Sequence, residues 1–310
     1  MHIMSTFPVY IPKLLPRDEN FVSGRRSCKG CGKALSMRMI SKMMGNKVIV
    51  SGPAPDASFP ARYNQASTGS LWDEITSGDV TTSFVDRLIA ENQSGTLGGS
   101  SKRPTKAVVG IDRRIFSKDL LALPEMFREE KNVVYICYDS EMYMNEMLKR
   151  SAPSLDAHEA PHDLTREELQ TFIRDKNIPA QVKECAPAYS ATACPSFPLD
   201  LMGKIKKALT TNGTAFISVL TPCPTAWLFK PELTAHLGEL AVTTGFYPLY
   251  EMEGDTVQLT KRVAQLKPLS EYFKLQQRYL AFLPEWLALL QEVTSEEYEK
   301  LVAHTTKKGV

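Results

Sequence analysis

The stretch Asn132-Val-Val-Tyr-Ile-Cys-Tyr-Asp139 decides the fold of this chain. An unbroken apolar run of this length, rich in β-branched and aromatic residues, is typical of a strand that is buried on both faces of a parallel sheet. Polar residues follow at once, in Asp139-Ser-Glu-Met-Tyr-Met-Asn145. Ligands of open parallel sheets bind beyond the carboxyl ends of the strands. The stretch therefore predicts both the kind of sheet and the place of a ligand site.

Shorter strand-like runs lie on either side of it and alternate with helical patterns, which predicts βαβ units. The other expected strands are 48–50, 107–111 and 215–220, and the expected helices are 34–44, 82–92, 118–130, 165–176, 199–209 and 232–243. From Leu266 onward the pattern is helical and amphipathic. We expect one α/β domain over residues 1–265, with a mostly parallel sheet covered by helices on both faces, and a C-terminal helical extension over 266–310.

The composition excludes several classes of protein. Of 310 residues, 43% are hydrophobic and 23% are charged, as in ordinary globular domains. The net charge of +2 does not indicate a nucleic-acid-binding protein. No apolar stretch is as long as a membrane span, and residues 1–17 do not have the pattern of a signal peptide. We expect a cytoplasmic protein without nucleic-acid or membrane partners.

Three of the six cysteines stand in settings that suit ligands. Cys28 and Cys31 form a Cys-x-x-Cys pair, and Cys223 lies between two prolines that stiffen its backbone. Cys137 falls inside the apolar run and is expected to be a buried, inert thiol. From these residues alone, the Cys28–Cys31 pair remains open between a metal site, such as one for zinc, and free thiols.

Two expected strand ends carry oxygen-bearing side chains. The first is Gly110-Ile-Asp112, and the second is the segment that begins at Asp139. A hard cation such as Mg²⁺ binds carboxylates, hydroxyls and backbone carbonyls and often accompanies phosphates. An aspartate at a strand end is also a common turn or helix-capping residue, so both interpretations stay open here.

Four ordered segments carry a resemblance to a known family. Tyr135-Ile-Cys-Tyr-Asp-Ser-Glu-Met-Tyr-Met-Asn145 resembles the Tyr-Ile-Cys-Tyr-Asp-Asn-Glu-Ala-Tyr-Met-Asn segment of pyruvate:ferredoxin oxidoreductase β subunits. Similar segments are Cys28-Lys-Gly-Cys-Gly-Lys-Ala-Leu35, Pro222-Cys-Pro-Thr-Ala-Trp227 and Leu266-Lys-Pro-Leu-Ser-Glu-Tyr-Phe-Lys-Leu-Gln276. The chain thus resembles the thiamine-diphosphate-binding (β) subunit of the 2-oxoacid:ferredoxin oxidoreductases over most of residues 20–280.

This resemblance implies a thiamine-diphosphate-binding fold and an enzyme that oxidatively decarboxylates a 2-oxoacid to an acyl-coenzyme A. It implies thiamine diphosphate, Mg²⁺ and a [4Fe–4S] cluster as cofactors, with electrons leaving to ferredoxin, to a ferredoxin-like δ subunit or to NAD. It also implies partner subunits of α and γ type, and activity only with the α-type partner. Pyruvate, branched-chain and aromatic 2-oxoacids all remain open as substrates.

Residues of the cofactor sites follow from the same resemblance. Asp112, Ser140 and the Met142 carbonyl take the positions of the Mg²⁺ ligands, and Asn145 takes that of an asparagine near the diphosphate.

For the cluster, Cys28, Cys31 and Cys223 match family ligands, with Gly30 inside the first motif. The fourth cysteine of the family is missing, and Asp56 stands near its position. An Asp-ligated [4Fe–4S] cluster, a three-iron cluster and no cluster are the three outcomes that remain open.

The chain departs from the family around the diphosphate. Ile111 and Arg113 replace both glycines of a Gly-Asp-Gly motif, and Glu146-Met147 replaces a Thr-Gly pair. Glycines there let the backbone approach a phosphate closely. Arg113 or Arg114 is a candidate for compensating positive charge. Two functions are therefore weighed: a catalytic subunit, which we favour, and a β-like scaffolding subunit that has lost one or both cofactors.

Overall fold

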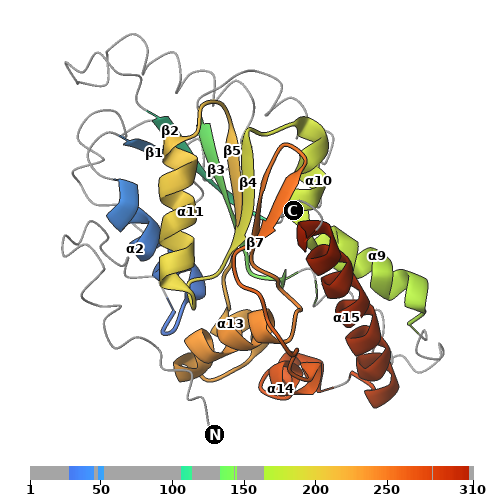
Figure 1. The fold of residues 1–310 in the computed structure, drawn as a ribbon. Helices are drawn as coiled ribbons and strands as arrows, with labels where there is room; N and C mark the ends of the chain where they lie inside the picture. Colours follow the sequence, from blue (N-terminus) through green and yellow to red (C-terminus); the bar gives the residue numbers. More distant parts are fainter. Residues whose placement is uncertain are drawn as a thin grey trace, which may run out of the picture.

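The computed structural model describes residues 28–44, 48–51, 106–113, 133–142, 144, 164–280 and 282–306. A seven-stranded sheet of order β1-β2-β3-β5-β4-β6-β7 forms its centre (Figure 1). The strands are β1 (Val48–Ser51), β2 (Lys106–Asp112), β3 (Val133–Asp139), β4 (Tyr189–Ala193), β5 (Ala215–Leu220), β6 (Tyr250–Glu253) and β7 (Thr256–Leu259). Strands β1 to β5 run parallel to one another. Strand β6 runs antiparallel to both of its neighbours, β4 and β7. The predicted α/β class and mostly parallel sheet are confirmed.

Strand β3 lies at the middle of the sheet, as its sequence predicted. Every residue of β3 is buried. Because alternate side chains of a strand point to opposite faces, both faces of the sheet are covered here. Pairing in register places Asp112 of β2 beside Tyr138, and Asp139 beside Leu220 of β5. The carboxyl ends of β2, β3 and β5 therefore meet at one edge of the sheet.

The helices of the described residues are α2 (Gly32–Met44), α9 (Arg166–Lys176), α10 (Ile178–Gln181), α11 (Pro198–Thr210), α12 (Pro224–Trp227), α13 (Thr234–Thr243), α14 (Leu269–Phe273) and α15 (Pro284–Thr306), with 3-10 turns η2 (Val182–Cys185), η3 (Pro231–Leu233) and η4 (Gln277–Tyr279). Helices α2 and α11 lie side by side over one face of the sheet (Figure 1). Ile40 of α2 and Ile205 of α11 pack there with Val134 and Ile136 of β3. The expected helices at 82–92 and 118–130 lie outside the described residues.

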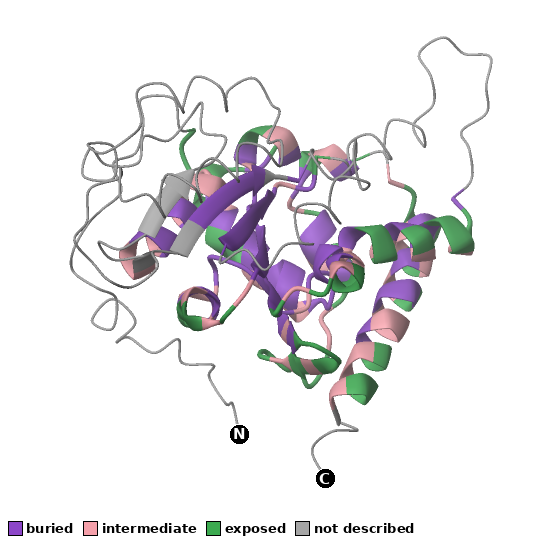
Figure 2. Ribbon diagram, turned by 90° about the horizontal axis from the view of Figure 1, so that it is seen from above, coloured by how far each residue is buried: buried purple, intermediate pink, exposed green. Residues whose placement is uncertain are grey.

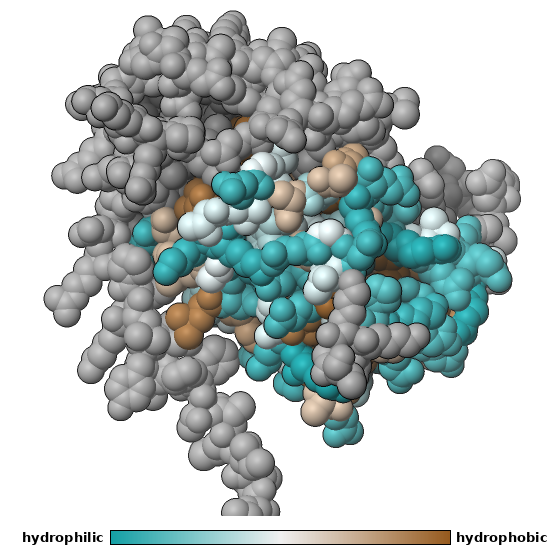
Figure 3. Space-filling view, turned by 45° about the horizontal axis from the view of Figure 1, so that its top comes forward, coloured by the Kyte–Doolittle hydropathy of each residue, from teal (hydrophilic) through white to brown (hydrophobic). Residues whose placement is uncertain are grey.

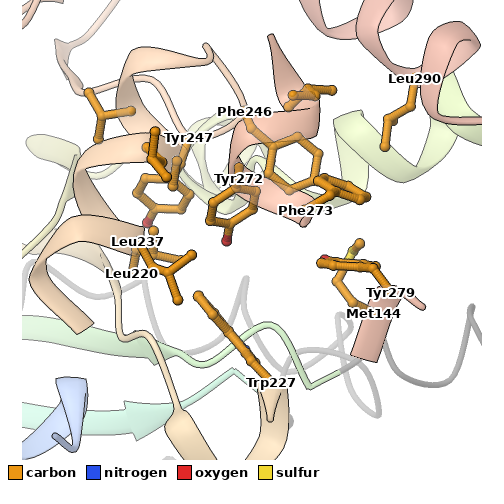
Figure 4. Packing of buried hydrophobic residues seen from close by; sticks show 14 of the residues in the cluster. Met144, Leu220, Trp227, Leu237, Phe246, Tyr247, Tyr272, Phe273, Tyr279 and Leu290 are labelled. Atoms are coloured by element: carbon orange, nitrogen blue, oxygen red, sulfur yellow. The ribbon is translucent and has the colours of Figure 1, made fainter. Parts of the chain in front are cut away.

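A second core lies beyond the carboxyl ends of the strands and is rich in aromatic side chains (Figure 4). It joins the end of β5 to α14 and α15. These helices confirm the helical pattern predicted from Leu266 onward. Members shown in Figure 4 include Trp227, Phe246, Tyr272, Phe273 and Tyr279. The C-terminal helices thus share a core with the strand ends, and α15 also packs on α9 and β7.

Burial follows the layers of the fold. The sheet is buried throughout its centre, whereas α9 and α15 expose one side to solvent (Figure 2). The face drawn in Figure 3 is mostly hydrophilic where the structure describes it, with small hydrophobic areas between polar ones. Within the described ranges, none of the helices combines the length and the apolar character needed to cross a bilayer.

Candidate functional site

The first cysteine motif is a tight turn that leads directly into α2. The amide of Cys31 donates a hydrogen bond of 3.2 Å to the carbonyl oxygen of Cys28, and α2 begins at the next residue, Gly32. Gly30 lies inside the turn with φ +70°, a conformation that glycine adopts without strain.

Glycines also let this turn lie directly against two later loops. A Cβ atom on Gly32 would be 2.6 Å from the carbonyl oxygen of Pro222, and one on Gly30 would be 2.6 Å from that of Pro231. Instead, the Gly32 amide donates a hydrogen bond of 3.0 Å to Pro222, and the Thr234 hydroxyl donates one of 2.7 Å to Gly30. The turn is therefore fixed beside the loop that carries Cys223.

Each of the three predicted ligand thiols accepts a hydrogen bond. The Thr225 hydroxyl donates to Cys28 Sγ at 3.5 Å, which links the first motif to the Cys223 loop. Backbone amides three residues further along the chain donate to the other two sulfurs, at 3.5 Å to Cys31 and 3.4 Å to Cys223. Both of these cysteines directly precede a helix, so the N-terminal amides of α2 and α12 are directed at sulfur.

Burial and the two other thiols both affect the pKa of Cys31. Burial raises the pKa of the Cys31 thiol, and negative charge on Cys223 and Cys28 raises it further, whereas the Ala34 amide lowers it. A cationic metal group at this point would favour the thiolates instead.

The three thiols are of the ligand type that iron–sulfur clusters use. Among the described residues, no three His, Cys, Asp or Glu side chains surround one metal-ion position. In a cluster the cysteine ligands bind different irons, so they need not surround one ion position. Amides donating to sulfur are also the contacts that tune a cluster. The predicted fourth ligand, Asp56, lies outside the described residues.

The loop after β3 is anchored through its backbone to the loop after β5. The Thr221 amide donates to the Asp139 carbonyl at 2.7 Å, and the Trp227 indole Nε1 donates to the Ser140 carbonyl at 2.6 Å. Glu141 follows with φ +49°, a left-handed conformation that is unusual for a residue with a side chain. Its amide donates to Asp139 Oδ1 at 2.8 Å.

A buried network of charges holds Glu141 in that conformation. The Glu141 carboxylate is fully buried and forms ion pairs with Lys176 at 2.5 Å and with Arg278 at 2.8 Å. The Tyr272 hydroxyl donates to it at 3.1 Å. Burial alone would raise the pKa of this carboxyl, but Lys176 and Arg278 outweigh burial and hold that pKa below its usual value.

Burial shifts two neighbouring groups toward their neutral forms. It lowers the pKa of Lys176 to about 8, although Glu141 opposes the change. It raises the pKa of Asp139 to about 6, and the negative charge of Glu141 adds to the effect. No sequence pattern indicates this network, because Lys176 and Arg278 are distant from Glu141 along the chain.

The structure brings some of the predicted cation ligands to one edge of the sheet. The backbone of Asp112 ends β2, directly beside β3, and Ser140 and Met142 follow the end of β3. Ser140 is half-buried, and Met142 is 40% exposed, so this loop borders the molecular surface. The structure describes only the backbone of Asp112, and Asn145 and Glu146 lie outside the described residues.

Arg113, a candidate for positive charge near the diphosphate, bonds to the end of α9. It is buried, and its Nη2 donates a hydrogen bond of 2.8 Å to the carbonyl oxygen of Asp175 near the end of α9. Helix C-termini carry partial negative charge, which suits this cation. Arg114, the other candidate, lies outside the described residues.

A cavity of about 300 Å³ lies elsewhere, between α9, α15 and the loop after α13. Lys176, Phe246, Tyr250 and Tyr298 are among its lining residues. Of the predicted site residues that the structure describes, none lines this cavity.

Comparisons with known proteins give the class of protein. The chain belongs to the β subunits of the 2-oxoacid:ferredoxin oxidoreductases. It is 31% identical over 296 residues to pyruvate synthase subunit PorB of Methanocaldococcus jannaschii, covering 92% of this chain and 97% of that protein. It is 32% identical over 300 residues to the subunit of the same name from Methanothermobacter thermautotrophicus, covering 93% and 99%.

Other similarities extend over the same range. Ketoisovalerate oxidoreductase subunit VorB of Pyrococcus horikoshii is 29% identical over 304 residues, covering 93% of this chain and 94% of that protein. No family model matches the chain. Among solved structures, 2-oxoglutarate:ferredoxin oxidoreductase from Magnetococcus marinus aligns with a TM-score of 0.37 and 17% identity, over 72% of this chain and 70% of that one.

Proposed function

We propose that this chain is the catalytic β subunit of a 2-oxoacid:acceptor oxidoreductase and holds an iron–sulfur cluster at Cys28, Cys31 and Cys223. The observation that carries the proposal is the contact between the two loops that hold these thiols. Cys223 lies 223 − 31 = 192 residues after Cys31, yet backbone and side-chain hydrogen bonds join the two loops. A fold that kept only a structural role would not need sulfur atoms at this junction.

We propose the second cofactor site at the adjoining ends of β2 and β3. Asp112 and the Ser140 hydroxyl would be oxygen ligands of Mg²⁺, together with the Met142 carbonyl, and Asn145 would lie near the diphosphate. Thiamine diphosphate, when bound, supplies the carbanion chemistry that allows a 2-oxoacid to lose CO₂. The residues of this chain bind and orient it, and coenzyme A takes the acyl group.

The proposal includes the remaining partners and the fourth cluster ligand. Asp56 would complete the cluster through a carboxylate, because four-iron clusters need four anionic ligands. Subunits of α and γ type would complete the enzyme, and ferredoxin or a ferredoxin-like δ subunit would take the electrons. The relatives are named for pyruvate and ketoisovalerate, so a 2-oxoacid of that kind is the proposed substrate.

A scaffolding role is the second candidate, and Arg113 is the observation that favours it. This side chain stands at the position of a family glycine and donates a hydrogen bond to the Asp175 carbonyl near the end of α9. Ile111, at the position of the other glycine, is also buried. A β-like subunit that has lost thiamine diphosphate would tolerate both changes.

An assay of the complex purified without oxygen separates the two candidates. Thiamine content and 2-oxoacid-dependent reduction of ferredoxin are measured for the unaltered chain, for Asp112→Asn and for Asp175→Asn, a matched change at an exposed position of α9. Catalysis predicts bound thiamine and turnover that only Asp112→Asn abolishes. An assembled complex without thiamine or turnover would establish the scaffolding role.

A further inference from the structure

We infer that Trp227 and Arg278 are positioning residues that fix the Ser140–Met142 loop relative to the Cys223 loop. They join the two proposed cofactor sites, and the inference rests on the proposed function for the identity of those cofactors. We call the contacts of Trp227 and Arg278 with these two loops the bridge.

The first half of the bridge starts at Cys223. Its carbonyl oxygen accepts a hydrogen bond of 2.9 Å from the amide of Trp227, four residues along the chain and one turn of α12 away. The Trp227 side chain is fully buried, and its indole donates to the Ser140 carbonyl at 2.6 Å. One rigid side chain therefore connects a proposed cluster ligand to a proposed Mg²⁺ ligand.

The second half comes from the C-terminal segment. The Arg278 guanidinium lies 4.2 Å from the centre of the Trp227 ring, a cation–π contact that holds the indole in place. The same guanidinium donates to the Glu141 carbonyl at 3.2 Å and to its carboxylate at 2.8 Å. The Gln277 amide also donates to the Leu228 carbonyl at 3.2 Å, which ties this segment to the end of α12.

The strained backbone of Glu141 explains why the loop needs such support. A left-handed conformation is energetically unfavourable in a residue with a side chain and persists only where surrounding contacts impose it. Glu141 stands between Ser140 and Met142, so its φ decides where the Met142 carbonyl points relative to the Ser140 hydroxyl. Loss of the bridge would let the two proposed ligands move independently.

Trp227→Phe is the sharpest variant, because it removes the indole donor and keeps an aromatic ring beneath Arg278. Trp286→Phe is its matched control, since Trp286 belongs to the same hydrophobic core and is likewise buried. Both variants are studied in the complete complex. Two readouts are compared: hydrogen exchange of the backbone amides in 139–144, and the dissociation constant of thiamine diphosphate with Mg²⁺.

We expect faster exchange in 139–144 for Trp227→Phe only, with cofactor binding weakened roughly tenfold, the equivalent of one hydrogen bond. Equal exchange in the two variants, or unchanged cofactor affinity in Trp227→Phe, would overturn the inference. An unaltered complex that binds no thiamine diphosphate would overturn the proposed function, and the exchange comparison would then decide the bridge by itself.

Discussion

The amide of Gly32 donates a hydrogen bond of 3.0 Å to the carbonyl oxygen of Pro222. This contact places the end of the first cysteine motif next to the residue before Cys223, although 222 − 32 = 190 residues separate the two in the sequence. The loops that carry the three thiols lie together because Gly30 and Gly32 in one turn allow backbone to lie against backbone, and the site depends on that close approach.

Gly32→Ala is therefore expected to push the two cysteine loops apart, because the added Cβ would lie 2.6 Å from the Pro222 oxygen. We expect loss of most of the iron bound by this chain and a lower melting temperature. Gly203→Ala in α11 is the control, since a Cβ there meets nothing within 4 Å and alanine favours a helix by about 1 kcal/mol. Full iron content in Gly32→Ala would contradict this account of the junction.

Arg278→Met tests the buried charge network. Removing one partner of a buried ion pair costs about 3–5 kcal/mol, since the remaining charge of Glu141 stays in the interior. We expect a clear fall in the melting temperature of the complex by calorimetry. Lys300→Met is the comparison, because its pair with Glu297 at 2.6 Å is largely exposed and should contribute little. Equal effects of the two changes would show that Glu141 does not depend on Arg278.

Cys194 should be unreactive in the native protein. Burial raises the pKa of its thiol to about 11, and the side chain is fully buried. At pH 8 the thiolate fraction is about one in a thousand, and it rises about tenfold with each pH unit below 11. Mass spectrometry after brief alkylation should find Cys185, which is partly exposed, labelled and Cys194 labelled only after unfolding. Native labelling of Cys194 at the rate of Cys185 would show that this part of the core opens.

The sequence predicted the elements whose pattern is local. The run at 132–138 forms β3, and the runs near 107–111 and 215–220 form β2 and β5. A short unbroken apolar segment is typical of a strand buried on both faces of a sheet. Helix α9 follows from its own signals, since Thr165 and Glu168 form a capping box at its start.

Elements without such a pattern were missed. Strand β4 reads Tyr-Ser-Ala-Thr-Ala, and although all of it is buried, small and polar residues gave no strand signal. The Thr192 hydroxyl in this strand donates a hydrogen bond of 2.7 Å to the Pro248 carbonyl. Only folding brings these two groups together. The hairpin of β6 and β7 was missed because its strands are short and only half-buried.

The same distinction separates the two parts of the candidate site. Cys28, Cys31 and Cys223 were found from motifs that are compact in the sequence. Glu141, with its partners from α9 and the C-terminal segment, was not, because a buried ion pair between distant residues leaves no local pattern. Long-range electrostatics becomes visible only once the chain is folded.

The most direct test of the central claim is the iron content of the complex purified without oxygen, compared between the unaltered chain, Cys223→Ser and Cys185→Ser. Because partner subunits can carry clusters of their own, the difference between variants is the quantity that matters. If Cys28, Cys31 and Cys223 hold one cluster, Cys223→Ser loses about three or four iron atoms for each copy of this chain and Cys185→Ser loses none. Identical iron content in all three complexes would contradict the account.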